Sequence, residues 1–240
     1  MTRSWMISST QHRREDLLLI AAVIWNADYA DDLNINRGKI NMSFDFEKMF
    51  DYTKNIVTSA PNVRSGMFQL LDYCETNSPN PVWANIRQLD FEGDVERLRA
   101  WLEKVLSSEP PTEKINAFWF GLFNPVLENG EVSAGLYLSG STKFDPDDET
   151  GDWAVEDDDS YLPEARYANS QVLKEIYRLI SKTEVANIGE YVLCLGFAGL
   201  ATKVMCQLVN RKFLLGERKK RDIAVGFDSG DFIILDGIEK

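Results

Sequence analysis

Ten carboxylates stand within residues 144–164, FDPDDETGDWAVEDDDSYLPE, and no lysine or arginine lies among them. We call this stretch the acidic segment. It supplies −10 of the chain's formal net charge of −12. Carboxylates at this density can hold a divalent cation, attract a basic protein surface, or remain a solvated loop that repels itself.

Cation binding is one hypothesis for the acidic segment. A calcium loop of the EF-hand type carries acids at its first, third, fifth and twelfth positions. Counted from Asp145, these positions hold Asp145, Asp147, Glu149 and Glu156. The sixth position, where that loop needs glycine, is Thr150. We therefore keep a divalent-cation-binding protein, or a hydrolase that uses these carboxylates, as the alternative function.

Partner binding is the hypothesis that we favour. Trp153 and Tyr161 are costly to leave in water, which predicts that parts of the acidic segment dock on the fold. Pro146 and Pro163 stiffen its ends. An ordered, negatively charged surface suits a basic protein, and buried aromatic contacts would strengthen the binding. The residues that we expect to contact such a partner are Asp147, Asp148, Asp152, Trp153, Asp157, Asp158 and Tyr161.

Catalytic machinery of the common kinds is not indicated. His12 is the only histidine, so neither a triad nor a histidine metal site can be assembled. Cys74, Cys194 and Cys206 lack metal-ligand spacing and follow apolar residues, which predicts buried, reduced thiols. We therefore expect no enzyme, no cofactor and no metal centre.

Charge and hydropathy also limit the partners. An acidic chain is poorly suited to nucleic acid, where lysine and arginine supply the affinity. The apolar run Tyr191–Ala201 is too short to cross a bilayer before Lys203, and no signal peptide is apparent. We expect a cytoplasmic protein without a membrane partner, and the sequence leaves its oligomeric state open.

The elements that must position these residues change character along the chain. Residues 1–110 are predicted to be mainly helical, with Asp45 as one N-cap. The periodic apolar positions predict helices at 15–26, 45–58, 62–75 and 93–107.

Residues 111–240 are predicted to form an α+β region around the acidic segment, in one compact unit with the first half. Strands are expected at 116–126 and 133–140 around Asn129-Gly130, and at 223–227 and 232–236 around a tight turn, Asp228–Asp231. Helices are expected at 168–181, capped by Ser170 or Asn169, and at 190–208. In the latter helix, Gly196 and Gly199 would allow close packing.

An antiparallel sheet covered by helices is the expected architecture. The basic residues Arg211, Lys212 and 218–221 are interpreted as a solvated loop between helix and hairpin. Pairing with the acidic segment, within the fold or between two copies of the chain, is the alternative.

The second half resembles acidic bacterial immunity proteins, which protect a cell against polymorphic or contact-dependent toxins. The resemblance covers about residues 115–235. It rests on Phe118–Asn124 (FWFGLFN), Leu136–Ser141 (LYLSGS), Phe144-Asp145, Asp152–Ala154, Tyr161–Ser170 (YLPEARYANS), Gly189–Leu200 (GEYVLCLGFAGL) and Val225–Phe232 (VGFDSGDF). It implies an inhibitor that neutralises a basic toxin and has no catalytic residues of its own.

Overall fold

The computed structural model describes residues 45–240 apart from 149–150, 155–156 and 229. The predicted helix at 15–26 and His12 lie outside these residues. The described residues belong to one compact unit, in which helices and a five-stranded sheet share a main hydrophobic core. The predicted α+β class is confirmed.

The first half of the described chain is helical, as predicted. Its helices are α2 (Phe46–Ser59), α3 (Val63–Asn77), α4 (Val82–Ile86) and α5 (Phe91–Ser108). Asp45 accepts a hydrogen bond from Lys48 N, which confirms it as the N-cap of α2. Asp90 accepts from Gly93 N and caps α5, so this helix starts two residues before the predicted boundary.

The sheet has the strand order β3-β2-β1-β4-β5. The strands are β1 (Ala117–Phe123), β2 (Gly135–Ser141), β3 (Tyr167–Ala168), β4 (Lys220–Phe227) and β5 (Phe232–Glu239). Two antiparallel hairpins, β1–β2 and β4–β5, agree with the prediction.

The expectation of a purely antiparallel sheet is wrong, because β1 and β4 pair in parallel. The chain leaves β2 and returns to β4 through the helices of the second half. A crossover of this kind brings a strand back in the same direction as its neighbour.

The helices of that crossover are α6 (Gln171–Ile180), α7 (Ala186–Ile188), η3 (Gly189–Cys194), α8 (Leu195–Leu208) and α9 (Arg211–Leu215). Ser170 Oγ accepts from Leu173 N at 3.1 Å and is the cap of α6. The η3 stretch is a π-helical turn that joins α7 to α8.

A continuous helical stretch, Ala186–Leu208, runs through the centre of the fold. It packs against α2, α3, α5 and the sheet. A Cβ at Gly196 would lie 2.2 Å from Leu70 Cδ1, and one at Gly199 would lie 2.8 Å from Val57 Cγ1. The close packing predicted at these glycines is confirmed. The stretch is long and apolar enough to cross a bilayer, but 78% of its apolar window is buried inside the fold, as in a core helix.

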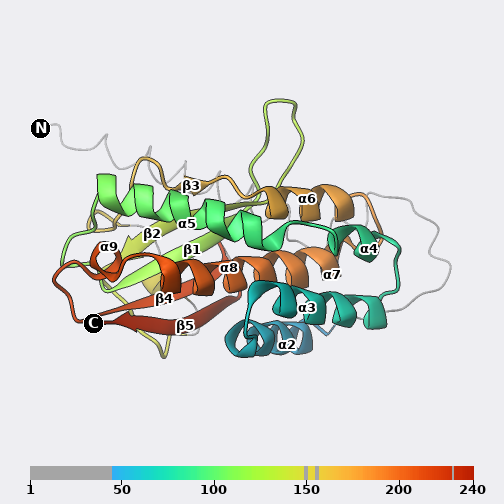
Figure 1. Cartoon of the computed structure of the whole chain (residues 1–240), viewed down its shortest axis with the longest axis horizontal. Coiled ribbons are helices and arrows are strands. Elements are labelled where there is room, and N and C mark those ends of the chain that lie inside the picture. Colours follow the sequence, from blue (N-terminus) through green and yellow to red (C-terminus); the bar gives the residue numbers. More distant parts are fainter. Residues whose placement is uncertain (1–44, 149–150, 155–156, 229) are drawn as a thin grey trace, which may run out of the picture. The chain divides into compact units, whose positions relative to one another are not determined.

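The two faces of the sheet are covered differently. Phe118, Phe120 and Val225 belong to the main core, which the helices complete on one face (Figure 1). Trp119 and Ala224 lie on the opposite face, in a smaller cluster with Trp153 of the acidic segment. The acidic segment therefore helps to cover the face that the main core leaves open.

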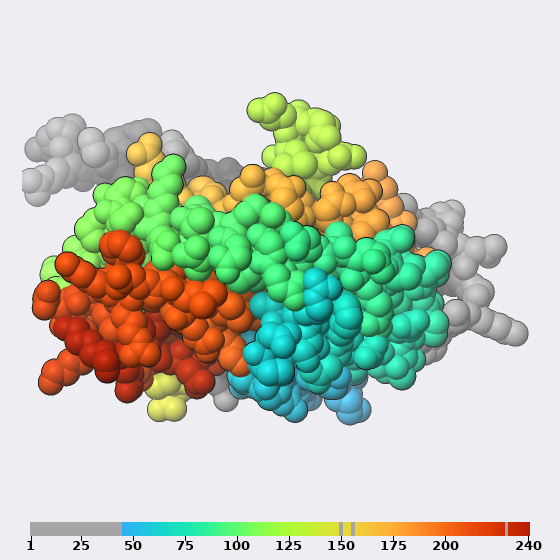
Figure 2. All heavy atoms as spheres, viewed as in Figure 1, coloured from blue at the N-terminus to red at the C-terminus, as the bar shows by residue number. Residues whose placement is uncertain are grey.

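The connection between β1 and β2 projects from the body of the molecule (Figure 2). Val126 bridges Val132, and Gly130 has φ 80° at the tip. Leu127 N donates to Glu131 O, and Gly130 N donates to Leu127 O, both at 2.8 Å. This is the pattern of a three-residue loop that ends in a left-handed glycine. The predicted hairpin at Asn129-Gly130 is confirmed, although the regular strands end before this arm.

The prediction of a solvated basic loop is wrong for Arg221. Its side chain is fully buried in β4. Its guanidinium donates to the carbonyl oxygens of Ile115 at 2.9 Å, Leu214 at 2.6 Å and Thr112 at 2.8 Å. It also lies 5.2 Å from the centre of the Phe118 ring. Burial lowers the pKa of Arg221 to about 10, so it remains charged at neutral pH.

Replacing Arg221 with methionine should lower the free energy of unfolding by about 3 kcal/mol or more. Each buried acceptor left without a donor costs on the order of 1–3 kcal/mol. Urea unfolding followed by circular dichroism measures this change. The exposed neighbour Lys219 is the control, since Lys219→Ala should stay within about 0.5 kcal/mol of wild type. Equal effects of the two variants would contradict a structural role for Arg221.

Candidate protein-binding surface

The acidic segment is attached to the sheet through Trp153. The indole is 4% exposed and contacts three rings: Phe144 at 4.9 Å, Trp119 at 5.8 Å and Phe232 at 6.2 Å between centroids. Its Nε1 is buried without a hydrogen-bond partner, so packing of the ring holds it. The docking predicted for Trp153 is confirmed. In this structure the ring offers no free face to a partner.

Backbone contacts fix the same turn. Trp153 lies in the short 3₁₀ helix η2 (Asp152–Ala154). Its N–H donates to Asp148 Oδ2 at 3.3 Å, and its carbonyl accepts from Ser141 Oγ at 2.5 Å. Gly151, just before η2, has φ 74°, a conformation that favours glycine. The middle of the acidic segment is thus held to the end of β2.

Tyr161 attaches the far end of the acidic segment. Its backbone bridges Gly140 of β2, and its hydroxyl donates to Glu109 O at 2.5 Å. Its ring lies 6.2 Å from that of Phe118. Burial raises the pKa of the phenol well above its usual value. The predicted contact residue is therefore partly buried and engaged with its own fold.

The carboxylates of the acidic segment lie mainly on its outer side. Asp147, Asp152 and Asp158 are exposed, while Asp148 and Asp157 are partly buried. Asp157 forms an ion pair with Lys143 at 2.6 Å, and this hydrogen-bonded lysine lowers the pKa of the carboxyl group. The predicted residues thus divide into an outward acidic group and two aromatic anchors.

Two lysines form ion pairs with this surface. Besides the pair of Lys143 with Asp157, Lys114 lies 3.9 Å from Asp159. Exposed pairs of this kind contribute little to stability and are screened by salt. Asp147 and Asp158 are exposed to solvent and are accessible to another molecule.

The cation hypothesis gains no support from the described residues. They contain no group of three or more His, Cys, Asp or Glu side chains arranged to hold a metal ion. Asp145 Oδ1 instead accepts from Asp147 N at 3.0 Å, which is an ordinary turn contact. Glu149 and Glu156, two of the expected ligands, lie outside the described residues.

Three carboxyl groups near the ends of β1 and β4 were not recognised as a set in the sequence. Tyr137 donates to Asp228, Tyr191 donates to Asp231, and Asn124 Nδ2 donates to Glu190 at 3.0 Å. The interpretation of Asp228–Asp231 as a tight turn holds, because Phe227 N donates to Asp231 O at 3.1 Å. The sequence signal that could have indicated them is an acidic residue next to an aromatic one. Glu190 precedes Tyr191 in GEYVLC, and in GFDSGDF each of the two aspartates adjoins a phenylalanine.

Two of these groups are poorly solvated. Burial raises the pKa of Glu190, and the hydrogen bond from Asn124 opposes this only in part. Burial likewise raises the pKa of Asp228, although the residue as a whole is exposed. Perturbed carboxyl groups can transfer protons in active sites. Here each accepts a hydrogen bond from a side chain of another segment, which ties the end of the sheet together.

The cysteines behave as predicted. Cys74, Cys194 and Cys206 are free and buried, and burial raises the pKa of each thiol well above its usual value. Thiols with raised pKa values are poor nucleophiles at neutral pH.

Comparison of the chain with protein-family models, curated proteins and solved structures finds no match.

The anchoring role of Trp153 can be tested by truncation. Trp153→Ala should cost about 3–5 kcal/mol, as is typical for a buried aromatic side chain. It should also speed proteolysis within residues 144–160, because the acidic segment loses its packed contact. Trp153→Phe is the matched control: it keeps a ring and loses no hydrogen bond, so most of the protection should remain. Limited proteolysis with mass-spectrometric mapping of the fragments measures this change. Equal cleavage rates of wild type and Trp153→Ala would contradict the anchoring role of Trp153.

The raised pKa of Glu190 makes stability depend on pH. The folded state holds this proton more tightly than the unfolded state, so the contribution of Glu190 to stability falls as pH rises above the ordinary carboxyl value of 4.5 through the raised one. Glu190→Gln keeps an acceptor for Asn124 and removes the charge. Its melting temperature, relative to wild type, should therefore be more favourable at pH 8 than at pH 4. A pH-independent difference, like that expected for exposed Glu128→Gln, would contradict this.

Proposed function

We propose that this chain is a non-catalytic protein-binding protein whose acidic segment docks on a basic surface of its partner. The observation that carries the proposal is the attachment of the acidic segment to the sheet at Trp153, which leaves Asp147, Asp152 and Asp158 exposed. A charged loop that is only solvated does not require a buried tryptophan. A charged loop that is packed on the fold presents its carboxylates in a defined arrangement.

The physical benefit of this arrangement is preorganisation. A loop that is already attached at Trp153 and Tyr161 loses less conformational freedom on binding than a free loop. Its concentrated charge speeds encounter with a basic surface and opposes acidic competitors. The partner's basic residues would pair with exposed carboxylates such as Asp147 and Asp158.

The finer form of the proposal is an immunity-type inhibitor that neutralises a basic toxin. It is supported by the sequence resemblance over about residues 115–235 and by the charge of the acidic segment. An enzyme that acts on nucleic acid needs a basic active site. A preorganised acidic surface is complementary in charge to such a site and would block it.

The binding proposal is tested with the full chain as bait in a lysate of the cell that encodes it. Asp147→Asn/Asp158→Asn removes two exposed charges from the acidic segment. Asp51→Asn/Glu217→Gln removes the same charge from α2 and the turn after α9, and serves as the control. Wild type and control should retain a basic protein that the first variant loses, as identified by mass spectrometry.

Titration of the purified partner then measures the effect. We expect about a tenfold or greater loss of affinity for Asp147→Asn/Asp158→Asn, and a steep loss of wild-type affinity as salt rises. Binding that is equal for both double variants, or insensitive to salt, would overturn the assignment of the acidic segment.

The role as an immunity-type inhibitor is tested separately, by the growth of a bacterial host. The partner, expressed alone in a bacterial host, should stop growth, and co-expression of the wild-type chain should restore it. Co-expression of Asp147→Asn/Asp158→Asn should restore it less well. A harmless partner would refute the inhibitor role while leaving the binding role intact.

A further inference from the structure

Asn129 is the only asparagine of the sequence that glycine follows. It lies near the tip of the arm that joins β1 to β2, residues 124–134, which projects from the body in Figure 2. Asn129 and Gly130 are both exposed. A Cβ built at Gly130 would meet no atom within 4 Å apart from its two chain neighbours. The peptide bond between the two residues therefore lies open to solvent.

Asparagine is chemically labile, and it is most so where the next residue has no Cβ to obstruct its backbone nitrogen. The Gly130 nitrogen can attack Cγ of Asn129 and lose its proton, while the side-chain amide leaves as ammonia and a cyclic succinimide forms. Water then opens the ring. Addition at Cγ breaks the bond from Cγ to nitrogen and gives aspartate. Addition at the main-chain carbonyl breaks its bond to nitrogen and gives isoaspartate. The net reaction consumes one water and releases one ammonia.

Three hydrogen bonds occupy the reacting groups in the folded tip. Gly130 N donates to Leu127 O at 2.8 Å. Asn129 Oδ1 accepts from Glu131 N, and Asn129 Nδ2 donates to Glu131 Oε2, both at 3.0 Å. The attack requires the amide to leave Glu131 and the glycine nitrogen to leave Leu127. The reaction must therefore proceed from an opened tip.

Opening the tip is inexpensive because the arm buries little surface. Val126, Leu127 and Val132 are 65%, 39% and 37% exposed. Segments with few buried contacts open locally at a small fraction of the global free energy of unfolding. Glycine adds conformational freedom at the position where the backbone must rotate. The hydrogen bonds thus slow the reaction at Asn129 without preventing it.

Two other asparagines precede serine, a small residue, and provide a comparison. Asn77 ends α3 and Asn169 stands just before α6. The serines that follow, Ser78 and Ser170, are 5% and 1% exposed. In each case the attacking nitrogen belongs to a buried residue at a helix end, so the reaction would have to disrupt that helix end. The arm therefore offers the most reactive of the three positions.

We propose that Asn129 is a site of spontaneous deamidation, at which the chain converts its own amide to aspartate and isoaspartate. Either product adds one negative charge to the chain's −12 and places it between Glu128 and Glu131. Isoaspartate also inserts a methylene carbon into the main chain, so the three-residue loop no longer matches the Leu127–Glu131 pair that closes it. The arm is separate from the acidic segment, and the inference does not depend on the proposed function.

The test incubates the full chain in warm, mildly alkaline buffer and maps its peptides by mass spectrometry at intervals. Deamidation is scored by the mass gained when an acid replaces an amide, and isoaspartate by enzymatic methylation. A sample unfolded in guanidinium chloride shows the rate without the fold. We expect Asn129 to convert before Asn77 and Asn169 in the folded chain, and more slowly than in the unfolded chain.

Variants of the flanking carboxylates test the role of the tip. Glu131→Ala removes the acceptor of Asn129 Nδ2, so the folded chain should deamidate about fivefold faster. Glu128→Ala removes the same charge without a bond to Asn129 and should leave the rate unchanged. Circular dichroism checks that both variants are folded. A folded chain that keeps Asn129 intact while the unfolded chain converts overturns the proposal. Equal rates in the two variants overturn the control of the reaction by the contact with Glu131.

Discussion

The buried guanidinium of Arg221 is the interaction on which the arrangement of the sheet depends. It stands at the start of β4 and binds carbonyl oxygens before β1 and in α9. A parallel pair has no hairpin to set its register, so contacts at the strand ends must do so. Arg218 adds to the same junction, donating to Asn116 Oδ1 at 2.7 Å. A positive charge in this position is stabilised by oriented carbonyl dipoles and the ring of Phe118, and the nearby carboxylate of Glu113 also favours it.

A buried carboxylate has the corresponding role on the helical side. Asp94 of α5 is fully buried and accepts from Ser170 Oγ at 2.5 Å and from Val172 N at 3.1 Å. It thereby satisfies donors at the first turn of α6. Two buried polar side chains, Arg221 and Asp94, thus join segments that are distant in sequence. An unpaired charge at either site would be costly, which favours one arrangement of the elements over others.

The sequence predicted those elements of the fold that depend on local patterns of residues. Apolar periodicity and caps located α2, α5 and α6, and glycine-containing turns located both hairpins. Strand order depends on contacts between segments that are distant in sequence. The parallel pairing of β1 and β4 therefore could not be predicted from a local sequence pattern. Arg221 was misread because charge in a basic run usually means exposure. Trp153 was recognised as an anchor, but its buried state also removes it from the surface that was expected to contact a partner. The hydrogen bonds to Glu190, Asp228 and Asp231 come from residues that approach these carboxyl groups only in the folded chain, so no local sequence pattern predicts them.

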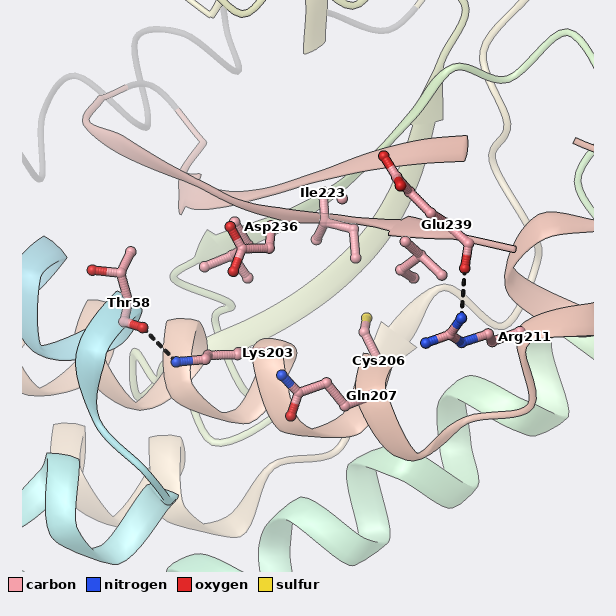
Figure 3. A pocket seen from close by; sticks show the side chains of 11 residues that line it. Thr58, Lys203, Cys206, Gln207, Arg211, Ile223, Asp236 and Glu239 are labelled. Carbon is pink, nitrogen blue, oxygen red and sulfur yellow. Dashed lines mark hydrogen bonds between the residues drawn. The ribbon is translucent and has the colours of Figure 1, made fainter. Parts of the chain in front are cut away.

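The last strand, β5, contributes to both faces of the sheet. Phe232 and Ile234 pack against the cluster that contains Trp153, while Leu235 and its neighbour Ile223 of β4 line a pocket of about 250 Å³ beside α8 (Figure 3). The acidic segment therefore depends on β5 for part of its support, and the pocket depends on it for one wall. The pocket is lined by Lys203 and Arg211 and also by Asp236 and Glu239, so its formal charges balance, whereas the acidic segment carries ten carboxylates and no cation. Because one strand supports Trp153 on one face of the sheet and forms a wall of the pocket on the other, a displacement of β5 would alter both faces together.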